Sequence, residues 1–577
     1  MHRTTVTRAL VAALLGLTAC SAPSSPQSAS APTVRVCWPR DPESLNPVTL
    51  PNAYALQANT LLYQSLLAAD GATGRYQPWL AAGLPSVERR DSLTFLHYRL
   101  HPQAAWDNGQ PVLADDVAFT LKVLNCPGLP NEGLQGAVSF IQDVRLHPTD
   151  RRRFTLVCRG YAPEFVYNSG EFPILPQYLL DSSAHLRAVP LRRLTQGDTT
   201  VARLASLRAF QREFNQPERW RDARQLRGSG PYQLVSWQAG QLLTFARKPQ
   251  WWADKLPQSS PLLTARPARL EYHVVPNPAT ALLALRRGEL DVYPHVPGPD
   301  FARLRATDSA KFHLYSPASY RVVVLETNTQ RPQLRDASTR QALAMLQDYD
   351  QLLRATQYGQ GQRSASLISP REQWAYHDSL PLPAFSPPRA AQRLQQVGWQ
   401  RSSSGWHRPG EAAPLSLRLF YSAGDRTYET IALLFQQNAR QIGLPVTLHP
   451  TEAGRLSELR RNGEFDLCLR TLFGNPFSYD LRPLLHTRSI GSGGANRTRF
   501  GNAASDQLLE TISTTEDSVT KARLLHRLQT LLYREAPLIP LFFEPNRLAV
   551  SRRFDHVYPS GLEPGYTVTS FTAAVPQ

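Results

Sequence analysis

The chain has 577 residues, with 63 lysine plus arginine against 46 aspartate plus glutamate, and a formal net charge of +17. Hydrophobic residues make up 42% of it, which excludes disorder for most of its length, and 48 prolines spread along it exclude a coiled coil. Only five basic residues are lysines, and the one tight arginine run, 151–153, lies in a polar turn, so no nucleic-acid-binding surface is indicated.

The N-terminus carries the pattern of an export signal. Two arginines precede an apolar run at 9–17, which is too short to span a bilayer of about 30 Å. The run ends in Leu17-Thr18-Ala19-Cys20, which looks like a bacterial lipobox, in which the cysteine is diacylated; an ordinary signal peptide with a chance cysteine is the alternative. We expect a signal peptide at 1–19, and a lipidated Cys20 with a flexible Ser/Pro/Ala-rich tether at 20–32. The mature chain is predicted to be exported and lipid-anchored at the cell membrane, facing the periplasm or the cell exterior.

The first half of the chain predicts an α+β arrangement. Alternating or apolar runs indicate strands, and apolar residues at three- and four-residue steps indicate helices. The expected strands are 34–38, 93–100, 141–146 and 154–158, and the expected helices are 54–67 and 114–124. The helix at 114–124 begins with two aspartates, as the helix dipole favours.

From residue 270 the pattern changes to repeated helix–glycine–strand units. The first is a helix at 278–287, ended by Gly288 and followed by a strand at 290–293. A βαβ unit with a right-handed crossover follows, and then one more helix and strand. The strands of this region are expected at 415–421, 446–448 and 465–472, and its helices at 428–442 and 456–461. The second half therefore predicts an open, largely parallel or mixed sheet, with ligands outside the carboxyl ends of its strands.

Besides Cys20 the chain has four cysteines, and no two have the CxxC spacing of a zinc ribbon. Cys126 and Cys158 flank one predicted hairpin unit and are the candidate disulfide pair for an oxidising compartment. Buried free thiols are the equal alternative.

Motifs of catalysis are missing from the sequence. It contains neither a GxxxxGK phosphate loop nor a GxSxG nucleophile elbow. His97 and His101 lie on an alternating strand, where that spacing separates them by about 13 Å, too far to share a metal ion. We therefore expect no enzyme activity, no cofactor and no metal site.

Several short phrases occur in a fixed order along the chain. They include 41–47 (DPESLNP), 106–111 (WDNGQP), 228–232 (GSGPY), 288–291 (GELD) and 340–343 (RQAL). Together they resemble the family 5 extracytoplasmic solute-binding proteins, the peptide- and nickel-uptake receptors of ABC importers, over residues 33 to 550. Each phrase alone is a turn or core pattern typical of the fold.

The resemblance implies a mixed α/β, two-lobed fold of the periplasmic-binding-protein type, with an inserted third subdomain and two hinge strands. The expected parts are lobe Ia at 33–70, 191–275 and 536–577, subdomain Ib at 71–190, and lobe II at 276–535. Such a protein holds its solute between the lobes and closes by a hinge motion. The implied partners are a peptide or small-molecule solute and the permease and ATPase subunits of an importer, with membrane contact only through the lipid anchor, no nucleic acid, and a monomeric receptor.

The resemblance also directs attention to the loop after strand 465–472. In peptide-binding relatives an aspartate there pairs with the peptide α-amino group, and a tryptophan precedes it. Asn475 and Phe473 occupy these places here, so the charge-assisted pairing is lost unless Asp480 replaces it. Loop packing is the alternative role for the aromatic residues. The candidate ligand-binding residues are Asn328, Phe473, Asn475, Phe477, Tyr479 and Asp480.

The predicted function is capture of an oligopeptide or peptide-like solute for import. The alternatives are a receptor for a nickel chelate or another small solute, and a surface lipoprotein that uses the fold for adhesion, signalling or peptide holding.

Overall fold

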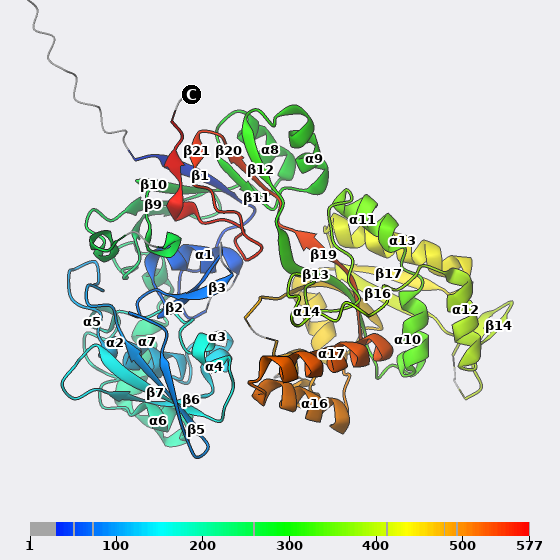
Figure 1. Ribbon diagram of the computed structural model, residues 1–577, viewed down its shortest axis with the longest axis horizontal. Coiled ribbons are helices and arrows are strands. Elements are labelled where there is room, and N and C mark those ends of the chain that lie inside the picture. The colour runs from blue at the N-terminus through cyan, green and yellow to red at the C-terminus, as the bar shows by residue number, and fades with distance from the viewer. Residues whose placement is uncertain are drawn as a thin grey trace, which may run out of the picture.

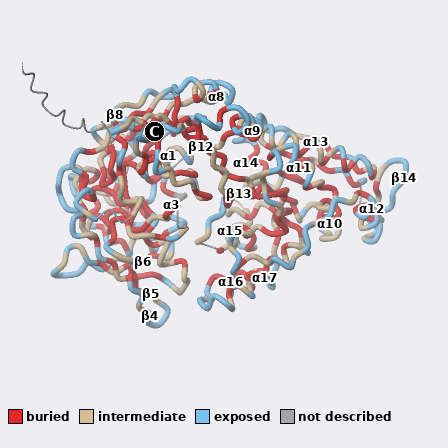
Figure 2. Tube along the Cα trace, turned by 45° about the horizontal axis from the view of Figure 1, so that its top comes forward, coloured by how far each residue is buried: buried red, intermediate tan, exposed pale blue. Residues whose placement is uncertain are grey.

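The computed structural model describes residues 31–49, 52–71, 74–257, 260–410, 413–477, 479–491 and 494–575. It shows two lobes side by side, linked by long strands near the middle of the molecule (Figure 1). Buried residues form the interior of each lobe (Figure 2). The predicted signal peptide, Cys20 and the tether up to residue 30 lie outside the described residues.

Lobe I is built on a seven-stranded mixed sheet. In spatial order its strands are β12 (Phe312–Tyr315), β20 (Leu548–Ser551), β11 (Val292–Pro294), β1 (Thr33–Trp38), β10 (Arg269–Val274), β9 (Leu242–Arg247) and β8 (Tyr232–Gln238). The central strand β1 runs parallel to both of its neighbours. Its last residue, Trp38, is fully buried and stacks on Tyr272 of β10 at 4.1 Å between ring centroids.

Helix α1 (Ala53–Leu62) packs beside this sheet and is shorter than the predicted 54–67. The chain becomes extended at Tyr63, and the loop before β8 lies against the helix end, where Gly230 donates its N–H to Leu62 O at 2.9 Å. A Cβ at Gly230 would stand 2.3 Å from Leu61 O, and one at Gly228 would stand 2.1 Å from Leu62 O. The two glycines of GSGPY are therefore needed so that this loop can pack closely against the backbone of α1.

The inserted subdomain contains an antiparallel sheet of four strands and several helices. The strands, in spatial order, are β4 (Ser86–Arg90), β5 (Leu93–Arg99), β7 (Arg153–Arg159) and β6 (Ile141–Leu146). Helix α2 (Ala114–Leu124) has the predicted bounds, and its Phe119 meets Phe210 of α7 (Ala205–Phe214) edge-to-face at 6.0 Å. Since α7 packs on this subdomain, the subdomain extends past its predicted end at residue 190.

The hairpin of β2 (Leu67–Asp70) and β3 (Arg75–Pro78) connects α1 to the subdomain. All four cysteines in the described part of the chain are free and buried. Cys158 lies in β7 and Cys126 just after α2, where its thiol contacts Pro127 O. The candidate Cys126–Cys158 disulfide is therefore not formed, because each thiol is packed separately into the apolar core of lobe I.

Lobe II is built on a five-stranded mixed sheet with helices on both faces. The strands, in spatial order, are β17 (Val446–Thr451), β16 (Leu417–Ser422), β18 (Leu467–Phe473), β13 (Ala318–Thr327) and β19 (Leu538–Pro545). The main helices are α10 (Ala337–Ala344), α11 (Tyr349–Gln357), α12 (Pro387–Gln396), α13 (Arg426–Gln441), α14 (Ala453–Asn462), α16 (Ala503–Thr514) and α17 (Ser518–Glu535). Because β16 is parallel to both β17 and β18, the predicted βαβ units are confirmed.

Alternate residues of β13 serve the two faces of this sheet. Val323 and Leu325 join the core under α10 to α13, while Val322 and Val324 join the core under α16 and α17. A strand that is apolar on both faces is what a central strand with two covered sides requires.

The predicted start of lobe II at residue 276 is wrong. Helix α8 (Pro278–Arg286) and strands β11 and β12 belong to lobe I, because β11 pairs with β1 and β12 pairs with β20. The predicted return near 536 is also too early, because β19 stays in the lobe II sheet beside β13. The chain crosses just before β13 and just after β19, and these two adjacent strands form the hinge.

Candidate functional site

The loop that follows β18 reaches from lobe II to lobe I. Its backbone is fixed by an N–H donated from Gly474 to Tyr320 O at 2.9 Å, and the Asn475 side chain accepts the N–H of Phe477 at 2.8 Å. The Phe477 ring then meets Tyr76 of β3 at 4.3 Å between centroids. The sequence therefore located a segment of the lobe interface, with Asn475 as its turn-forming residue.

Phe473 lies at the end of β18 and is 70% exposed, an unusual state for a large aromatic side chain. The guanidinium of Arg321, its cross-strand partner on β13, lies 5.5 Å from its ring centroid. Phe473 thus presents an apolar face next to the hinge.

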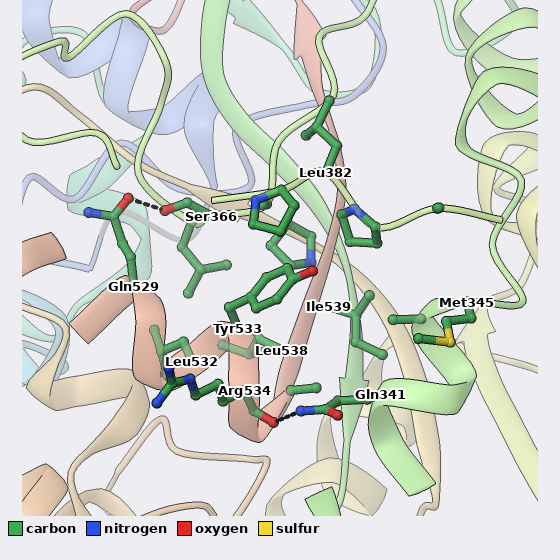
Figure 3. Close-up of a pocket in the computed structure, with 18 of the residues that line it drawn as sticks. Gln341, Met345, Ser366, Leu382, Gln529, Leu532, Tyr533, Arg534, Leu538 and Ile539 are labelled. Atoms are coloured by element: carbon green, nitrogen blue, oxygen red, sulfur yellow. Dashed lines mark hydrogen bonds between the residues drawn. The ribbon is translucent and has the colours of Figure 1, made fainter. Parts of the chain in front are cut away.

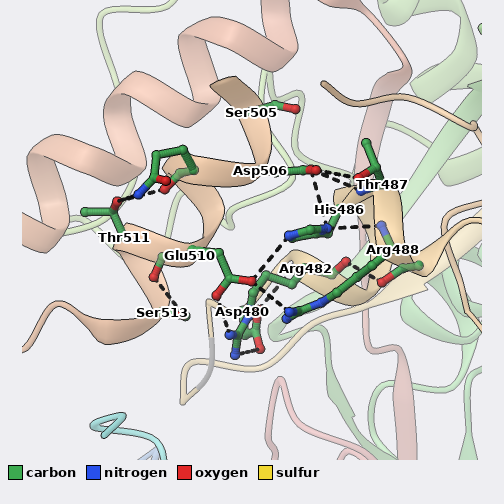
Figure 4. Close-up of polar contacts among 12 residues, drawn as sticks. Asp480, Arg482, His486, Thr487, Arg488, Ser505, Asp506, Glu510, Thr511 and Ser513 are labelled. Atoms are coloured by element: carbon green, nitrogen blue, oxygen red, sulfur yellow. Dashed lines mark hydrogen bonds and ion pairs between the residues drawn. The ribbon is translucent and has the colours of Figure 1, made fainter. Parts of the chain in front are cut away.

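Tyr479 and Asp480 have partners inside lobe II instead. The Tyr479 hydroxyl donates to Glu372 at 2.9 Å, and its ring meets Trp374 at 5.0 Å. Asp480 pairs with Arg482 at 2.7 Å, in a polar network that continues through Glu510 to His486 (Figure 4). Both side chains hold the loop in place, so the expectation that they face the solute is not supported.

Asn328 directly follows the end of β13 that is remote from the crossing to lobe I. It is 2% exposed, and its amide donates to Gly463 O at 3.0 Å and Phe465 O at 3.1 Å. It therefore ties β13 to the end of α14, and this geometry gives no support to its predicted role in ligand binding.

A cavity of about 300 Å³ lies between the lobes. Lobe I contributes Arg75 and the loop 560–562, and lobe II contributes Tyr320, Arg371 and Glu372, together with Pro476 next to Asn475. The volume is at the lower end of the range for small-molecule sites, about 300–1,000 Å³.

The two arginines give the cavity its positive charge. In the described part of the chain neither Arg75 nor Arg371 forms an ion pair; Arg371 lies over the Tyr320 ring at 5.4 Å. Glu372 is held by two hydroxyls, from Tyr320 at 2.7 Å and Tyr479 at 2.9 Å. Burial, followed by the bond to Glu372, raises the pKa of Tyr320 well above its usual range, so it stays a neutral donor. The Arg371 guanidinium also donates from Nη1 to Ala318 O. Its other N–H groups and the Arg75 guanidinium, from opposite lobes, are available to an anionic group.

A charged cluster connects the lobes at the hinge. Arg321 of β13 lies 2.9 Å from Glu544 of β19 and 3.7 Å from Glu563 of lobe I, which also contacts His295 at 3.1 Å. Burial acts to raise the pKa of Glu563, but His295 and Arg321 outweigh it and lower the pKa. Sequence reasoning missed these residues and the cavity arginines, because they come from distant segments without a local motif.

At the other side of the interface, Lys521 of α17 reaches Glu164 of the inserted subdomain at 2.5 Å, with both side chains 10% exposed or less. Arg89 of β4 also meets Glu516, just before α17, and this pair is exposed. Ion pairs and an aromatic contact therefore hold the lobes together around the cavity.

No group of three or more His, Cys, Asp or Glu side chains within the described ranges is arranged to hold a metal ion. In the same ranges, no helix combines the length and apolar content that crossing a membrane requires.

Two lobes, a pair of hinge strands and a cavity between the lobes define a binding protein of the periplasmic type. The chain matches the family described as "Bacterial extracellular solute-binding proteins, family 5 Middle" over residues 75–491, and it belongs to this family. Members of the family are extracytoplasmic solute receptors of ABC importers, so the protein is a receptor and not an enzyme.

Curated relatives include a nickel-binding periplasmic protein of Escherichia coli, 23% identical over 518 residues, which covers 88% of each chain. A probable D,D-dipeptide-binding periplasmic protein of the same organism, DdpA, is 24% identical over 525 residues, covering 89% of this chain and 88% of the relative.

Among solved structures, NikA from Brucella suis in complex with Fe(III)-EDTA superposes with a TM-score of 0.75 at 18% identity, over 94% of this chain and 100% of the other. The oligopeptide-binding protein AppA from Bacillus subtilis, in complex with a nonapeptide, gives 0.72 at 19%, over 94% and 99%. These likenesses confirm the predicted two-lobed fold.

Proposed function

We propose that the protein captures a small peptide or peptide-like solute with an exposed carboxylate and presents it to an ABC permease and its ATPase. The observation that carries this proposal is the pair of guanidiniums, Arg75 and Arg371, on opposite lobes of one cavity. Only the closed arrangement brings them together, so an anionic solute gains contacts in that state and shifts the lobes toward it. Guanidinium groups suit carboxylates because they offer paired donors in one plane.

The nickel-uptake alternative has support from the same observation. A metal chelate with free carboxylates could bind the same guanidiniums without any protein ligand to the metal. The curated relatives include both a nickel-binding protein and a probable D,D-dipeptide-binding protein. Asn475 argues only against free peptides, because an amide offers no charge to a free α-amine.

The test is a thermal-shift and calorimetric screen over free peptides, N-blocked peptides and nickel chelates. We expect N-blocked peptides with a free carboxylate to bind best, and Arg371→Gln to weaken them by about tenfold or more, since a charged hydrogen bond contributes about 1.5–3 kcal/mol. Solute at 100 times its Kd should add about 2.7 kcal/mol of stability.

A substitution at Asn475 and the ranking of the solutes in the screen distinguish between the solute classes. Asn475→Asp preserves the acceptor for Phe477 N–H and adds a charge, so it should improve binding of free peptides by about one to two decades. Preference for nickel chelates would favour the alternative. Arg371→Gln without effect on any bound solute would contradict the proposed site.

We also propose that the receptor is a monomer anchored by a lipid on Cys20. The apolar run and lipobox-like sequence motivate the anchor. In cells that make the protein, labelled fatty acid should be incorporated into the native chain and not into the Cys20→Ser variant. The variant should also move from the membrane fraction to the soluble fraction. Membrane retention of the serine variant would contradict this anchor.

A further inference from the structure

A second cavity lies within lobe II, and it shares no lining residue with the cavity between the lobes. It has a volume of about 390 Å³ and lies between α17, the start of β19, α10 and the segment 365–384. The cavity is open to solvent on one side, and its volume lies within the range of small-molecule sites, about 300–1,000 Å³.

The walls of the cavity are apolar. Tyr533 and Ile539 face it from α17 and β19 (Figure 3), and Met345, Leu367, Leu382, Leu532 and Leu538 also belong to its lining. The polar side chains are largely satisfied by protein partners: Gln529 accepts from Ser366 at 2.8 Å and donates to Ala375 O at 2.8 Å, and Gln341 donates to Arg534 O. An apolar ligand would therefore leave few polar groups of the cavity walls without a hydrogen-bond partner.

The rim of the cavity is positively charged. Arg389, Arg393 and Arg534 belong to its lining, whereas no aspartate or glutamate does among the described residues. Arg389 and Arg393 lie one turn apart on α12, and in the described ranges neither forms an ion pair; Arg393 donates at 2.9 Å to the neutral amide oxygen of Gln341. Arg534 contributes its carbonyl oxygen, which accepts from Gln341, while its side chain points away from Tyr533 and Ile539 (Figure 3). Apolar walls below unpaired guanidinium groups complement a molecule with an apolar tail and one anionic head.

We propose that this lobe II cavity binds a medium-chain fatty acid, with its hydrocarbon chain among Met345, Tyr533 and Ile539 and its carboxylate at Arg389 and Arg393. The cavity is accessible from solvent, because Leu382 of its lining is 44% exposed. The site is independent of the solute cavity and does not rest on the identity of the imported solute.

The test is calorimetric titration of the mature chain with laurate below its micellar concentration. We expect saturable binding at one site, and dodecanol, which lacks the charge, should bind about tenfold more weakly or worse. Arg389→Gln combined with Arg393→Gln should weaken laurate by at least a similar factor. Ala384→Trp should abolish binding, because Ala384 is an exposed residue of the lining and the indole would fill the cavity mouth.

Matched controls separate this site from non-specific binding. Arg212→Gln removes an exposed arginine of α7 in lobe I and should change nothing. Arg371→Gln should weaken the imported solute but not laurate. If laurate binding is lost on Arg371→Gln, survives both cavity variants, or is seen only with anionic vesicles, the proposal is wrong. Thermal unfolding of each variant without laurate establishes that it is folded.

Discussion

Replacing Glu326 by glutamine is expected to lower the free energy of unfolding by about 3 kcal/mol, since removing one partner of a buried ion pair leaves the other charge uncompensated. Glu326 is 1% exposed in the hinge strand β13. It accepts from Arg460 at 2.8 and 3.1 Å and from Arg470 at 3.0 Å. Urea unfolding followed by circular dichroism measures the loss as a lower midpoint at an unchanged slope.

The control is Glu458→Gln on α14, the helix that also carries Arg460. Glu458 pairs with Arg455 at 2.7 Å, but both side chains are 53% exposed, so its loss should cost less than about 1 kcal/mol. An equal cost for both variants would contradict the assigned importance of burial.

Acid should reduce the difference between the native chain and the Glu326 variant. Burial acts to raise the pKa of Glu326, but Arg460 and Arg470 outweigh it and bring the pKa below the ordinary 4.5. A carboxylate with a lowered folded-state pKa stabilises the fold above its unfolded pKa, and that contribution is lost as the pH falls through the folded pKa. The stability difference should therefore be complete near neutrality and shrink below about pH 4.5.

Replacing Lys521 by methionine is expected to weaken solute binding by about one to two decades while leaving each lobe folded. The Lys521–Glu164 pair exists only when the lobes meet, and methionine would leave Glu164 without its partner in the closed state. Calorimetry gives the affinity, and small-angle scattering should show less contraction at a fixed solute concentration.

Arg89→Gln provides the matched control, because it breaks the other interlobe pair, whose side chains are 47% and 41% exposed. It should change affinity by less than about fivefold. The double variant Lys521→Met with Glu164→Met should recover part of the loss, since two apolar side chains can replace a buried pair. Affinity within twofold of the native chain for Lys521→Met would show that this contact does not support closure.

Local sequence signals predicted the secondary structure well. The aspartates and apolar spacing of 114–124 place α2 at its observed bounds, and Gly463 ends α14 in the left-handed conformation at φ 75°. The lobe boundary was misplaced, because helix–glycine–strand units occur on both sides of it. Only pairing across some 250 residues, as between β1 and β11, assigns the unit at 278–294 to lobe I.

The site was predictable only in part, for the same reason. The loop with Phe473, Asn475 and Phe477 was found because it follows a recognisable strand, and the structure places it at the lobe interface. The cavity arginines were not found, since nothing in the sequence relates Arg75 to Arg371. Asp480 could have been read differently: Arg482, two residues later, is its partner.

Lys521 lies in α17 and Glu164 directly precedes α4 (Phe165–Asn168), and both helices lie away from the point where β13 and β19 link the lobes (Figure 1). For a rigid rotation about those strands, the displacement of any point grows with its distance from the axis, as on a door. The first few degrees of opening therefore separate this pair while Arg321 and Glu563, close to the axis, barely move. Each time the receptor releases its cargo, the rim of the cleft should admit water before the hinge has rearranged.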